Sequence, residues 1–422
     1  MRIPLHSPFS PGSDSVPQVW AGRTAQLCDW QQVVRPRRLA GIAERGRTIL
    51  GEAGMGKSSL VRRIAADARQ RGDWVTPQLR IPAGTDPLQR LAAALLELAD
   101  AAGLSAGHER RLGKLFARVE SIAAAGVSVT LRDAGTAAPY TSLTELLVEI
   151  GRAAAKRGDV VVLIHIDEAQ NIASEEALSQ LLIALGDALT FEDPVIAPGG
   201  VEIDRALPIA VYLTGLPEFE DRAGSRMGAT FARRFQTTTL TALDDDDLVA
   251  ALHTFVGQGW EVPDEEGGTE LITMEPAAAA AIADLCCGEP FLFQLAGERA
   301  WFAGTGNVIT EAEAMAGWQN AKAEARSHVE RILARLPQRE REFVEAMAEL
   351  PLEDRTLTRI ADRLGGLTAT AAGPTAQRLD SVRGIISRGK PYSFRHRAVE
   401  AHLASSWPDV SGSRPQGPST AD

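Results

Sequence analysis

The sequence has few cysteines, few aromatic residues and no long apolar run. Three cysteines among 422 residues, two of them adjacent, argue against a disulfide framework, and no Cys/His spacing of a zinc site occurs. No stretch of about 18 uncharged apolar residues is present, so we expect no membrane span. The amino-terminal segment lacks the apolar core of a signal peptide. These absences predict a protein of the reducing cytoplasm.

Basic charge is also scarce. The chain has 44 Lys and Arg residues against 55 Asp and Glu residues, a formal net charge of −11. This balance excludes a basic coat for nucleic acid over the whole surface, but it leaves room for a local basic face. The hydrophobic fraction of 45% and the charged fraction of 23% are typical of globular proteins. The length predicts two or three domains.

Apolar, β-branched runs alternate with helical periodicity in the first 240 residues. The expected strands are Thr48–Leu50, Val160–Ile166 and Ile209–Leu213. Continuous apolar runs of this kind are typical of strands buried on both faces, so the pattern predicts an α/β fold with a parallel sheet covered by helices. After Leu240 the strand signals fade and helices are expected.

A glycine-rich turn lies between the first strand and the helix expected from Lys57. Its residues, Gly51-Glu52-Ala53-Gly54-Met55-Gly56-Lys57-Ser58, match the P-loop pattern G-x-x-x-x-G-K-[ST]. Glycines let such a loop wrap tightly, so that backbone N–H groups and the helix N-terminus face phosphates. Lys57 is predicted to reach the β and γ phosphates and Ser58 to bind Mg²⁺, and Ser59 is included among the nucleotide-binding residues.

Two acids end the strand Val160–Ile166. Asp167 is predicted to hold Mg²⁺ through its water shell, and Glu168 to accept a proton from the attacking water or to orient it. The alternative is a pair of solvated carboxylates at a strand end. His165 is better interpreted as a core histidine than as a ligand. Thr214, at the end of the third strand, is either a sensor of the γ phosphate or a simple strand terminus.

These segments together resemble the AAA+ P-loop ATPases, in their origin-recognition-like and STAND-like branch with actinobacterial members, over about residues 17–408. The P-loop and the strand with Asp167-Glu168 carry most of the resemblance. It implies that the segment Val19–Leu27 borders the adenine through Trp20, Gly22 and Arg23. It also implies that Pro290, in Gly288-Glu289-Pro290, lies against the base, and that Leu213–Pro217 is the sensor strand.

The resemblance further implies ATP and Mg²⁺ as ligands and an arginine finger in the segment Phe231–Phe235. Arg233 fits the finger position, from which it would reach a phosphate on a neighbouring subunit or, through a loop, in its own chain. A finger that acts on a neighbour needs a homo-oligomer, which we expect. The alternative leaves Arg233 and Arg234 solvated on a surface helix. Relatives carry an arginine at the start of a lid helix, but here no arginine follows Pro290 until Arg299. This departure predicts a slow switch.

The last part of the chain predicts a winged helix-turn-helix, with helices at 338–350, 357–364 and 375–388 and a β wing at 389–396. Residues 375–402 include six basic residues and two acidic residues. This balance suits contacts to DNA phosphates, for which the candidates are Arg378, Arg383, Lys390 and Arg395. The alternative is that this module packs on the nucleotide domain and regulates it. The acids Asp244–Asp247 are interpreted as a favourable helix N-terminus.

The predicted organisation is an extended arm at 1–18, an AAA+ core at 19–243 with an insertion at about 103–140, a helical lid and linker helix at 244–336, the winged helix at 337–408 and a flexible tail at 409–422. The predicted function is an ATP-hydrolysing molecular switch. One alternative is an ATP-gated DNA-binding initiator, loader or regulator. Another is a signalling or defence scaffold that binds a protein partner, with the nucleotide as a structural ligand.

Overall fold

The structure is a computed structural model that describes residues 2–12, 15–104, 115, 117–121, 124, 139–196, 198–219, 223, 233–264 and 267–410. Its contacts divide the chain into two compact units. The helical unit comprises Met1–Arg23, Glu52–Gly56 and Thr241–Asp422, and the sheet unit comprises Thr24–Gly51 and Lys57–Leu240. Among the described residues, no helix is both long enough and apolar enough to cross a membrane.

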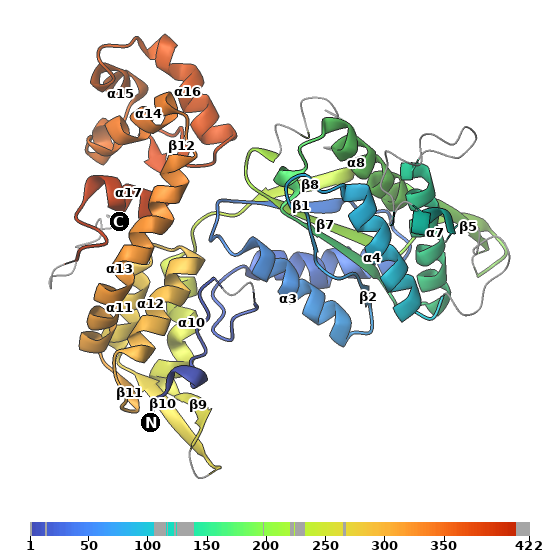
Figure 1. Cartoon of the computed structure of the whole chain (residues 1–422), viewed down its shortest axis with the longest axis horizontal. Coiled ribbons are helices and arrows are strands. Elements are labelled where there is room, and N and C mark those ends of the chain that lie inside the picture. Colours follow the sequence, from blue (N-terminus) through green and yellow to red (C-terminus); the bar gives the residue numbers. More distant parts are fainter. Residues whose placement is uncertain are drawn as a thin grey trace. The chain divides into compact units, whose positions relative to one another are not determined.

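The sheet unit is built on a parallel sheet with the strand order β2-β4-β7-β1-β8, and β3 also pairs with β4 (Figure 1). The α/β fold expected from the sequence is therefore confirmed. The strands are β1 (Gly46–Leu50), β2 (Trp74–Val75), β3 (Leu79–Arg80), β4 (Val162–Asp167), β7 (Ile209–Gly215) and β8 (Phe235–Thr239). The helices are α1 (Thr24–Cys28), η2 (Asp29–Val34), α2 (Arg35–Leu39), α3 (Lys57–Gln70), α4 (Pro87–Ala101), α7 (Pro139–Arg157), η3 (Ala169–Asn171) and α8 (Glu175–Thr190).

Alternation along β4 explains how both faces of the sheet are covered. Val162, Ile164 and Ile166 point into one cluster with the apolar faces of α4, α7 and α8. Figure 1 shows these three helices beside the sheet. On the opposite face, the Trp30 ring of η2 lies 6.1 Å from the Tyr212 ring of β7. Burial on both faces is why these strands read as continuous apolar runs.

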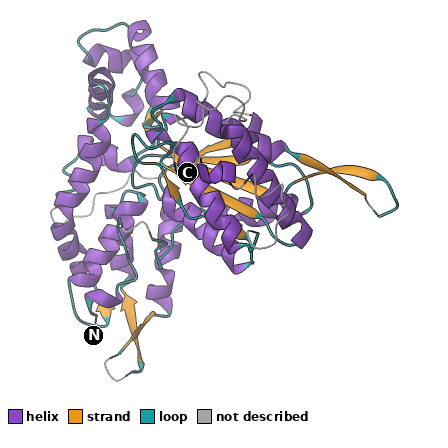
Figure 2. Cartoon of the chain, turned by 45° about the vertical axis from the view of Figure 1, so that its right-hand side comes forward, coloured by secondary structure: helices purple, strands orange, loops and turns teal. Residues whose placement is uncertain are grey.

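One feature of the sheet unit has no counterpart in the sequence prediction. Strands β5 (Glu192–Ile196) and β6 (Glu202–Ala206) form an antiparallel hairpin that projects from the parallel sheet (Figure 2). Most of the predicted insertion at 103–140 lies outside the described residues.

The helical unit corrects the expectation that strands end at Leu240. It contains a three-stranded sheet of β9 (Trp260–Pro263), β10 (Thr269–Met274) and β11 (Val308–Ile309). These strands are short and carry exposed polar side chains, so they lack the apolar runs that marked the core strands. The accompanying helices are α10 (Asp245–Gly257), α11 (Pro276–Leu285), α12 (Pro290–Phe302) and α13 (Glu311–Ala334).

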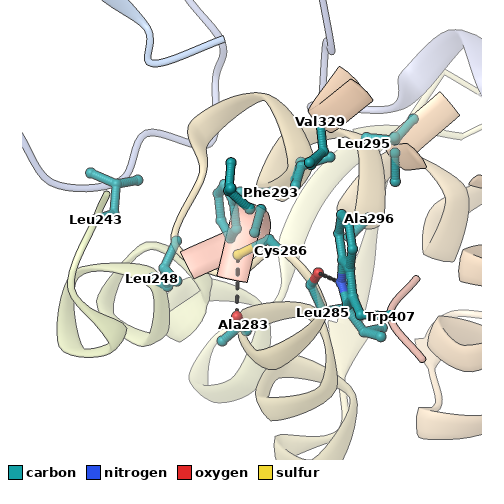
Figure 3. Packing of buried hydrophobic residues seen from close by; sticks show 14 of the residues in the cluster. Leu243, Leu248, Ala283, Leu285, Cys286, Phe293, Leu295, Ala296, Val329 and Trp407 are labelled. Carbon is teal, nitrogen blue, oxygen red and sulfur yellow. Dashed lines mark hydrogen bonds between the residues drawn. The ribbon is translucent and has the colours of Figure 1, made fainter. Parts of the chain in front are cut away.

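Aromatic and small apolar side chains fill the core of the helical unit. Figure 3 shows Cys286 donating its thiol to the Ala283 carbonyl at 3.2 Å and Trp407 donating its indole N–H to the Leu285 carbonyl at 3.0 Å. All three cysteines are free. The amino-terminal segment, with the short helix η1 (Pro4–His6), joins this core, because Phe9 is buried and its ring stacks 5.7 Å from that of Phe255.

The carboxyl-terminal elements are α14 (Gln338–Ala348), η4 (Leu352–Asp354), α15 (Leu357–Arg363), α16 (Ala369–Ser381), the hairpin of β12 (Ile386–Ser387) and β13 (Ser393–Phe394), and α17 (Arg397–Ala404). The third helix was predicted over 375–388, and this is wrong at both ends. The Thr368 side chain caps α16 by accepting from Ala371 N at 3.2 Å, and Pro374 lies inside the helix. Arg383 and Arg388 therefore follow the helix instead of lying on it.

Candidate functional site

The glycine-rich loop connects β1 to the first residue of α3, as its pattern requires. Gly54 and Gly56 have positive φ angles of 86° and 77°. L-residues with a side chain rarely adopt such angles, so glycine is needed at both positions. The loop ends at the N-terminus of a helix of 14 residues, where free backbone N–H groups and the helix dipole favour an anion.

Lys57 is a half-buried cation at this loop. Its Nζ donates to the Gly51 carbonyl at 2.8 Å. Burial lowers the pKa of Lys57 to about 8, against the opposite influence of the carboxylates of Asp167, Glu168 and Glu218. A polyanion bound here would raise that pKa again, because it favours the charged amine.

Asp167, at the end of β4, accepts four hydrogen bonds. Its Oδ2 accepts from Ser58 Oγ at 2.9 Å and from Gln78 Nε2 at 2.5 Å. Its Oδ1 accepts from Thr214 Oγ1 and from Glu168 N, the latter at 2.9 Å. Burial opposes ionisation, but the hydrogen bonds, led by that of Thr214, lower the pKa of Asp167. The structure thus brings together Ser58, Asp167 and Thr214 as an oxygen cluster suited to Mg²⁺.

Glu168 follows with an unusual backbone. Its φ of 57° and ψ of 42° are left-handed, a conformation that costs free energy for a residue other than glycine. Its Oε2 accepts from Asn171 Nδ2 at 2.7 Å, and the same amide group donates to the Ile81 carbonyl at 3.0 Å. Asn171 therefore holds the carboxylate that was predicted to act on water.

Sequence reasoning missed three side chains of this cluster: Gln78, Arg62 and Asn171. Gln78 lies in the break between β2 and β3, and its Oε1 accepts from Arg62 Nε at 2.5 Å while its amide reaches Asp167. The segment between Trp74 and Arg80 does not form one continuous strand, because it breaks here at Pro77, which has no backbone N–H. No motif marks Gln78 or Asn171, although Asn171 lies only three residues beyond Glu168.

His165 lies in the core, with 2% of its surface exposed. Burial lowers its pKa to about 4, so the ring is neutral at ordinary pH. Its Nε2 has no hydrogen-bond partner within the described part of the chain. The prediction of a core location is met, but this ring nitrogen is not satisfied.

The residues predicted to border the base belong to the helical unit. Arg23 donates through Nη2 to the carbonyls of Met55 at 3.2 Å and Thr241 at 2.9 Å. Trp20 donates its indole N–H to the Gly22 carbonyl at 2.8 Å. A Cβ placed on Gly56 would lie 3.6 Å from Pro290 Cβ. Residues of both segments predicted to border the base, Arg23 and Pro290, therefore lie beside the glycine-rich loop.

The candidate finger residues differ in their surroundings. Arg234 is paired with Asp187 at 2.7 Å. Arg233 is exposed and makes no hydrogen bond or ion pair with any other described residue. Phe231 and Ala232, from the same predicted segment, lie outside the described residues.

The basic residues near the carboxyl terminus are mostly paired within the chain. Arg378 and Arg383 each donate through Nε to the buried Glu340, both at 2.9 Å. Arg395 donates to Asp380. Lys390 is exposed. The local positive charge is therefore smaller than the residue count over 375–402 indicated. That count leaves out Glu340, which lies on α14 and balances the charge of Arg378 and Arg383.

Asp244–Asp247 lie at the start of α10, where Asp244 is the N-cap residue, as interpreted from the sequence. Across the described residues, no group of three or more His, Cys, Asp and Glu side chains is arranged to hold a metal ion.

Comparisons with known proteins agree with this geometry. Residues 44–222 match the family model described as an AAA domain. No protein of curated function matches the sequence. Among solved structures, the chain is similar to the Walker-type ATPase PABY2304 of Pyrococcus abyssi, with 14% identity, a TM-score of 0.54, and coverage of 91% of this chain and 96% of that one.

A second similar structure is the ORC2 protein of Aeropyrum pernix in its ADPNP-ADP complexes. Its identity is 15%, its TM-score 0.51, and the match covers 91% of this chain and 93% of that one. Identities this low establish the fold alone. Residues 44–222 thus match an AAA domain, and the chain has the fold of the P-loop AAA+ ATPases.

Proposed function

We propose that this protein binds and hydrolyses ATP with Mg²⁺ and acts as a molecular switch. One observation carries the proposal. A half-buried lysine, a serine hydroxyl, two acids and a threonine meet where β1, β4 and β7 end, directly after a loop with two positive-φ glycines. The side chains fit Mg²⁺ and a phosphate group, since Ser58 and Asp167 supply hard oxygen atoms and the Lys57 ammonium group lies at the end of the loop.

Each side chain has a distinct role in this reaction. Lys57 and the backbone N–H groups of the loop bind and orient the phosphates. Ser58 and Asp167 would hold Mg²⁺, and the ion would supply positive charge to balance the charge that develops on the phosphates. Glu168 takes the proton of the attacking water, and exchange of the Asn171 amide for that water would free its Oε2. Thr214 orients Asp167 and is the candidate sensor.

Contacts inside the helical unit support coupling between the loop and the carboxyl-terminal helices. Phe291, at the start of α12, donates its backbone N–H to the Gly54 carbonyl at 3.1 Å, and Glu52 is ion-paired with Arg335 after α13. A Cβ on Gly54 would come within 2.5 Å of the His328 ring. A change in the loop on nucleotide binding therefore has side chains of α12 and α13 to act on.

Two variants separate binding from chemistry. Lys57→Ala removes the charged phosphate ligand, and because hydrogen bonds to charged groups contribute about 1.5–3 kcal/mol, ATP affinity should fall at least about tenfold by calorimetry. Glu168→Gln should leave ATP binding nearly unchanged and lower turnover by about 10²-fold or more. Glu97→Gln, an exposed acid on α4, is the matched control and should do neither. Unchanged ATP binding in Lys57→Ala would overturn the proposal.

We also propose that Arg233 acts on the site of a neighbouring subunit, because it is exposed and unpaired among the described residues whereas Arg234 is bound to Asp187. Light scattering after size exclusion should then show ATP-dependent oligomers. Arg233→Ala should slow turnover in the oligomer while ATP binding persists. A monomer in every nucleotide state, with normal turnover in Arg233→Ala, contradicts this part. No arginine lies between Pro290 and Arg299, and Arg299 donates to Glu324 at 3.4 Å. The lack of an arginine at the start of this helix to contact the γ phosphate fits slow turnover.

For the carboxyl-terminal module, which we interpret as a winged helix, we favour regulatory packing over DNA binding. The observation behind this choice is the pairing of Arg378 and Arg383 with Glu340. Changing Arg378, Lys390 and Arg395 together to Glu should then alter the ATPase rate or oligomerisation. Fluorescence anisotropy with duplex DNA at two salt concentrations tests the alternative. Tight, salt-dependent binding that this triple variant loses would restore the DNA-binding hypothesis.

A further inference from the structure

The sheet unit contains a cavity of about 480 Å³ at the end of the sheet opposite the glycine-rich loop. Val160 and Pro208, which precede β4 and β7, line it, together with the last turns of α7 and the β5–β6 hairpin. Strand β4 has six residues and spans about 20 Å, so the cavity and Asp167 lie at opposite ends of the same strand. The proposed ATPase site does not include it.

The lining of this cavity is strongly cationic for a chain of net charge −11. Four basic side chains line it, and Asp193 is the one acidic side chain among the lining residues. That carboxylate is already engaged, because Arg152 donates to both of its oxygens, at 2.8 and 2.7 Å. Arg152 also donates to Glu149 at 2.7 Å. The other three cations, Arg38, Lys156 and Arg205, therefore have no carboxylate of the cavity to balance them.

Arg38 is the most buried of these cations, with 1% of its surface exposed. It donates to backbone carbonyls only, those of Leu189 at 3.0 Å, Leu207 at 3.4 Å and Glu44. Its Nε has no hydrogen-bond partner among the described residues. Burial lowers the pKa of Arg38 to about 10, so the guanidinium is still charged at neutral pH. Glu44 is the carboxylate that acts on this charge, but it already accepts from Arg37, from Arg47 and from the backbone N–H of Arg45, so a bound anion would offset part of the cost of burying Arg38.

Arg205, on β6, is held by a glycine at the edge of the cavity. A Cβ on Gly41, which has a φ of +72°, would come within 2.4 Å of Arg205 Nε, so the glycine makes room for the guanidinium. Arg205 donates to the Leu39 carbonyl at 3.3 Å and forms no ion pair with the described residues. Lys156 lies on the last turn of α7, where the helix dipole already favours a cation. The dipole of α7 does not stabilise the charges of Arg38 and Arg205, which lie on other elements.

We propose that this cavity binds a small organic anion. Its carboxylate or phosphate group contacts Arg205 and Lys156 above the buried charge of Arg38, since guanidinium groups bind such oxyanions in a two-pronged geometry. Its apolar body packs against Val160 and Leu207, which are buried side chains of the lining. The volume lies within the range of small-molecule sites, about 300–1,000 Å³.

The test uses 4-phenylbutyrate as the probe, because a carboxylate avoids the phosphate preference of the glycine-rich loop. Calorimetric titration of the full chain in saturating ATP should show one saturable site. The uncharged analogue 4-phenylbutan-1-ol should bind at least about tenfold more weakly, because it forms no charge-assisted bonds. Arg205→Ala should weaken the probe about tenfold and Arg205→Lys less. Arg90→Ala, an exposed arginine of α4, should change nothing.

Several results would overturn the proposal. Equal binding of the alcohol and the carboxylate would show a merely apolar cavity. Unchanged probe affinity in both Arg205→Ala and Lys156→Ala would place the probe elsewhere, as would displacement of the probe by ATP. Absence of saturable binding at millimolar probe would show that the cavity takes no such anion. Thermal denaturation of each variant checks folding, and Lys156→Ala, at an exposed position, keeps the test decisive if Arg205→Ala does not fold.

Discussion

Glu289 is a fully buried carboxylate that joins three elements of the helical unit. It is the N-cap residue of α12, and its exposure is 0%. Its Oε2 lies 2.7 Å from His328 Nε2 on α13. Its Oε1 lies 3.5 Å from Nδ1 of His396, the N-cap residue of α17, and these two atoms form no hydrogen bond. Because three helices contact this one charge, its removal should destabilise the whole helical unit.

The magnitude follows from the ionisation of this group. Burial opposes the charge, but the contacts with His328 and His396 outweigh it and lower the pKa of Glu289 from 4.5 to about 2. The difference corresponds to about 3 kcal/mol of folding free energy for the ionised form. Since the folded pKa is depressed, this stability is present above pH 4.5 and is lost as the pH falls toward 2. Glu289→Gln keeps the shape of the side chain and removes the charge.

We therefore expect Glu289→Gln to lower the unfolding free energy by about 3 kcal/mol at pH 7. At pH 4 the gap between the parent protein and the variant should narrow by about 1 kcal/mol. Urea denaturation followed by tryptophan fluorescence at the two pH values measures both quantities. Glu275→Gln is the control, because Glu275 is an exposed N-cap residue of α11 and its loss should cost less than about 1 kcal/mol. A variant as stable as the parent at pH 7, or a gap that widens at pH 4, would refute this reasoning.

Three further predictions concern the nucleotide site. With its pKa at about 8, Lys57 should take up as much as about three quarters of a proton when ATP binds at pH 8.5, seen as a buffer-dependent calorimetric enthalpy that Lys57→Met lacks. Asn171→Ala should free Glu168 and raise turnover by up to about tenfold at unchanged ATP affinity, because one hydrogen bond to a charged group is lost. Slower turnover in this variant would contradict the idea that Asn171 restrains Glu168. Thr214→Val should raise the pKa of Asp167 and weaken Mg²⁺ activation about tenfold in a titration of the ATPase rate, whereas Thr214→Ser should not.

The core of the fold and the centre of the site could be predicted because their signals are local. The glycine-rich loop needs positive φ angles at fixed spacing, and β4 needs a continuous apolar run that ends in Asp167-Glu168. Both requirements concern consecutive residues, so they can be recognised in the sequence. The parallel order of the strands follows from the helices between them, because a parallel pair needs a crossover connection.

The parts that escaped prediction depend on partners distant in the sequence. Gln78 reaches Asp167 across 89 residues, and Arg378 meets Glu340 across 38, so no window of sequence shows either contact. Helix α16 was placed too late because proline usually begins a helix, but here Pro374 lies inside one. The projecting β5–β6 hairpin has exposed side chains on both strands and lacks the buried runs that reveal core strands.

The hydrogen bonds of the two adjacent acids explain why they take different roles. Asp167 accepts four bonds, from Ser58, Gln78, Thr214 and the next backbone N–H, which keep it ionised and leave it little freedom to move. A fixed carboxylate is suited to hold a metal ion, because coordination needs ligands in defined positions. Among the described side chains, Asn171 donates to the Glu168 carboxylate, which lies on a left-handed backbone that already stores strain. Exchanging one amide for a water molecule costs far less than rebuilding a four-bonded network, so Glu168 is the acid of the pair that can move to act as the base.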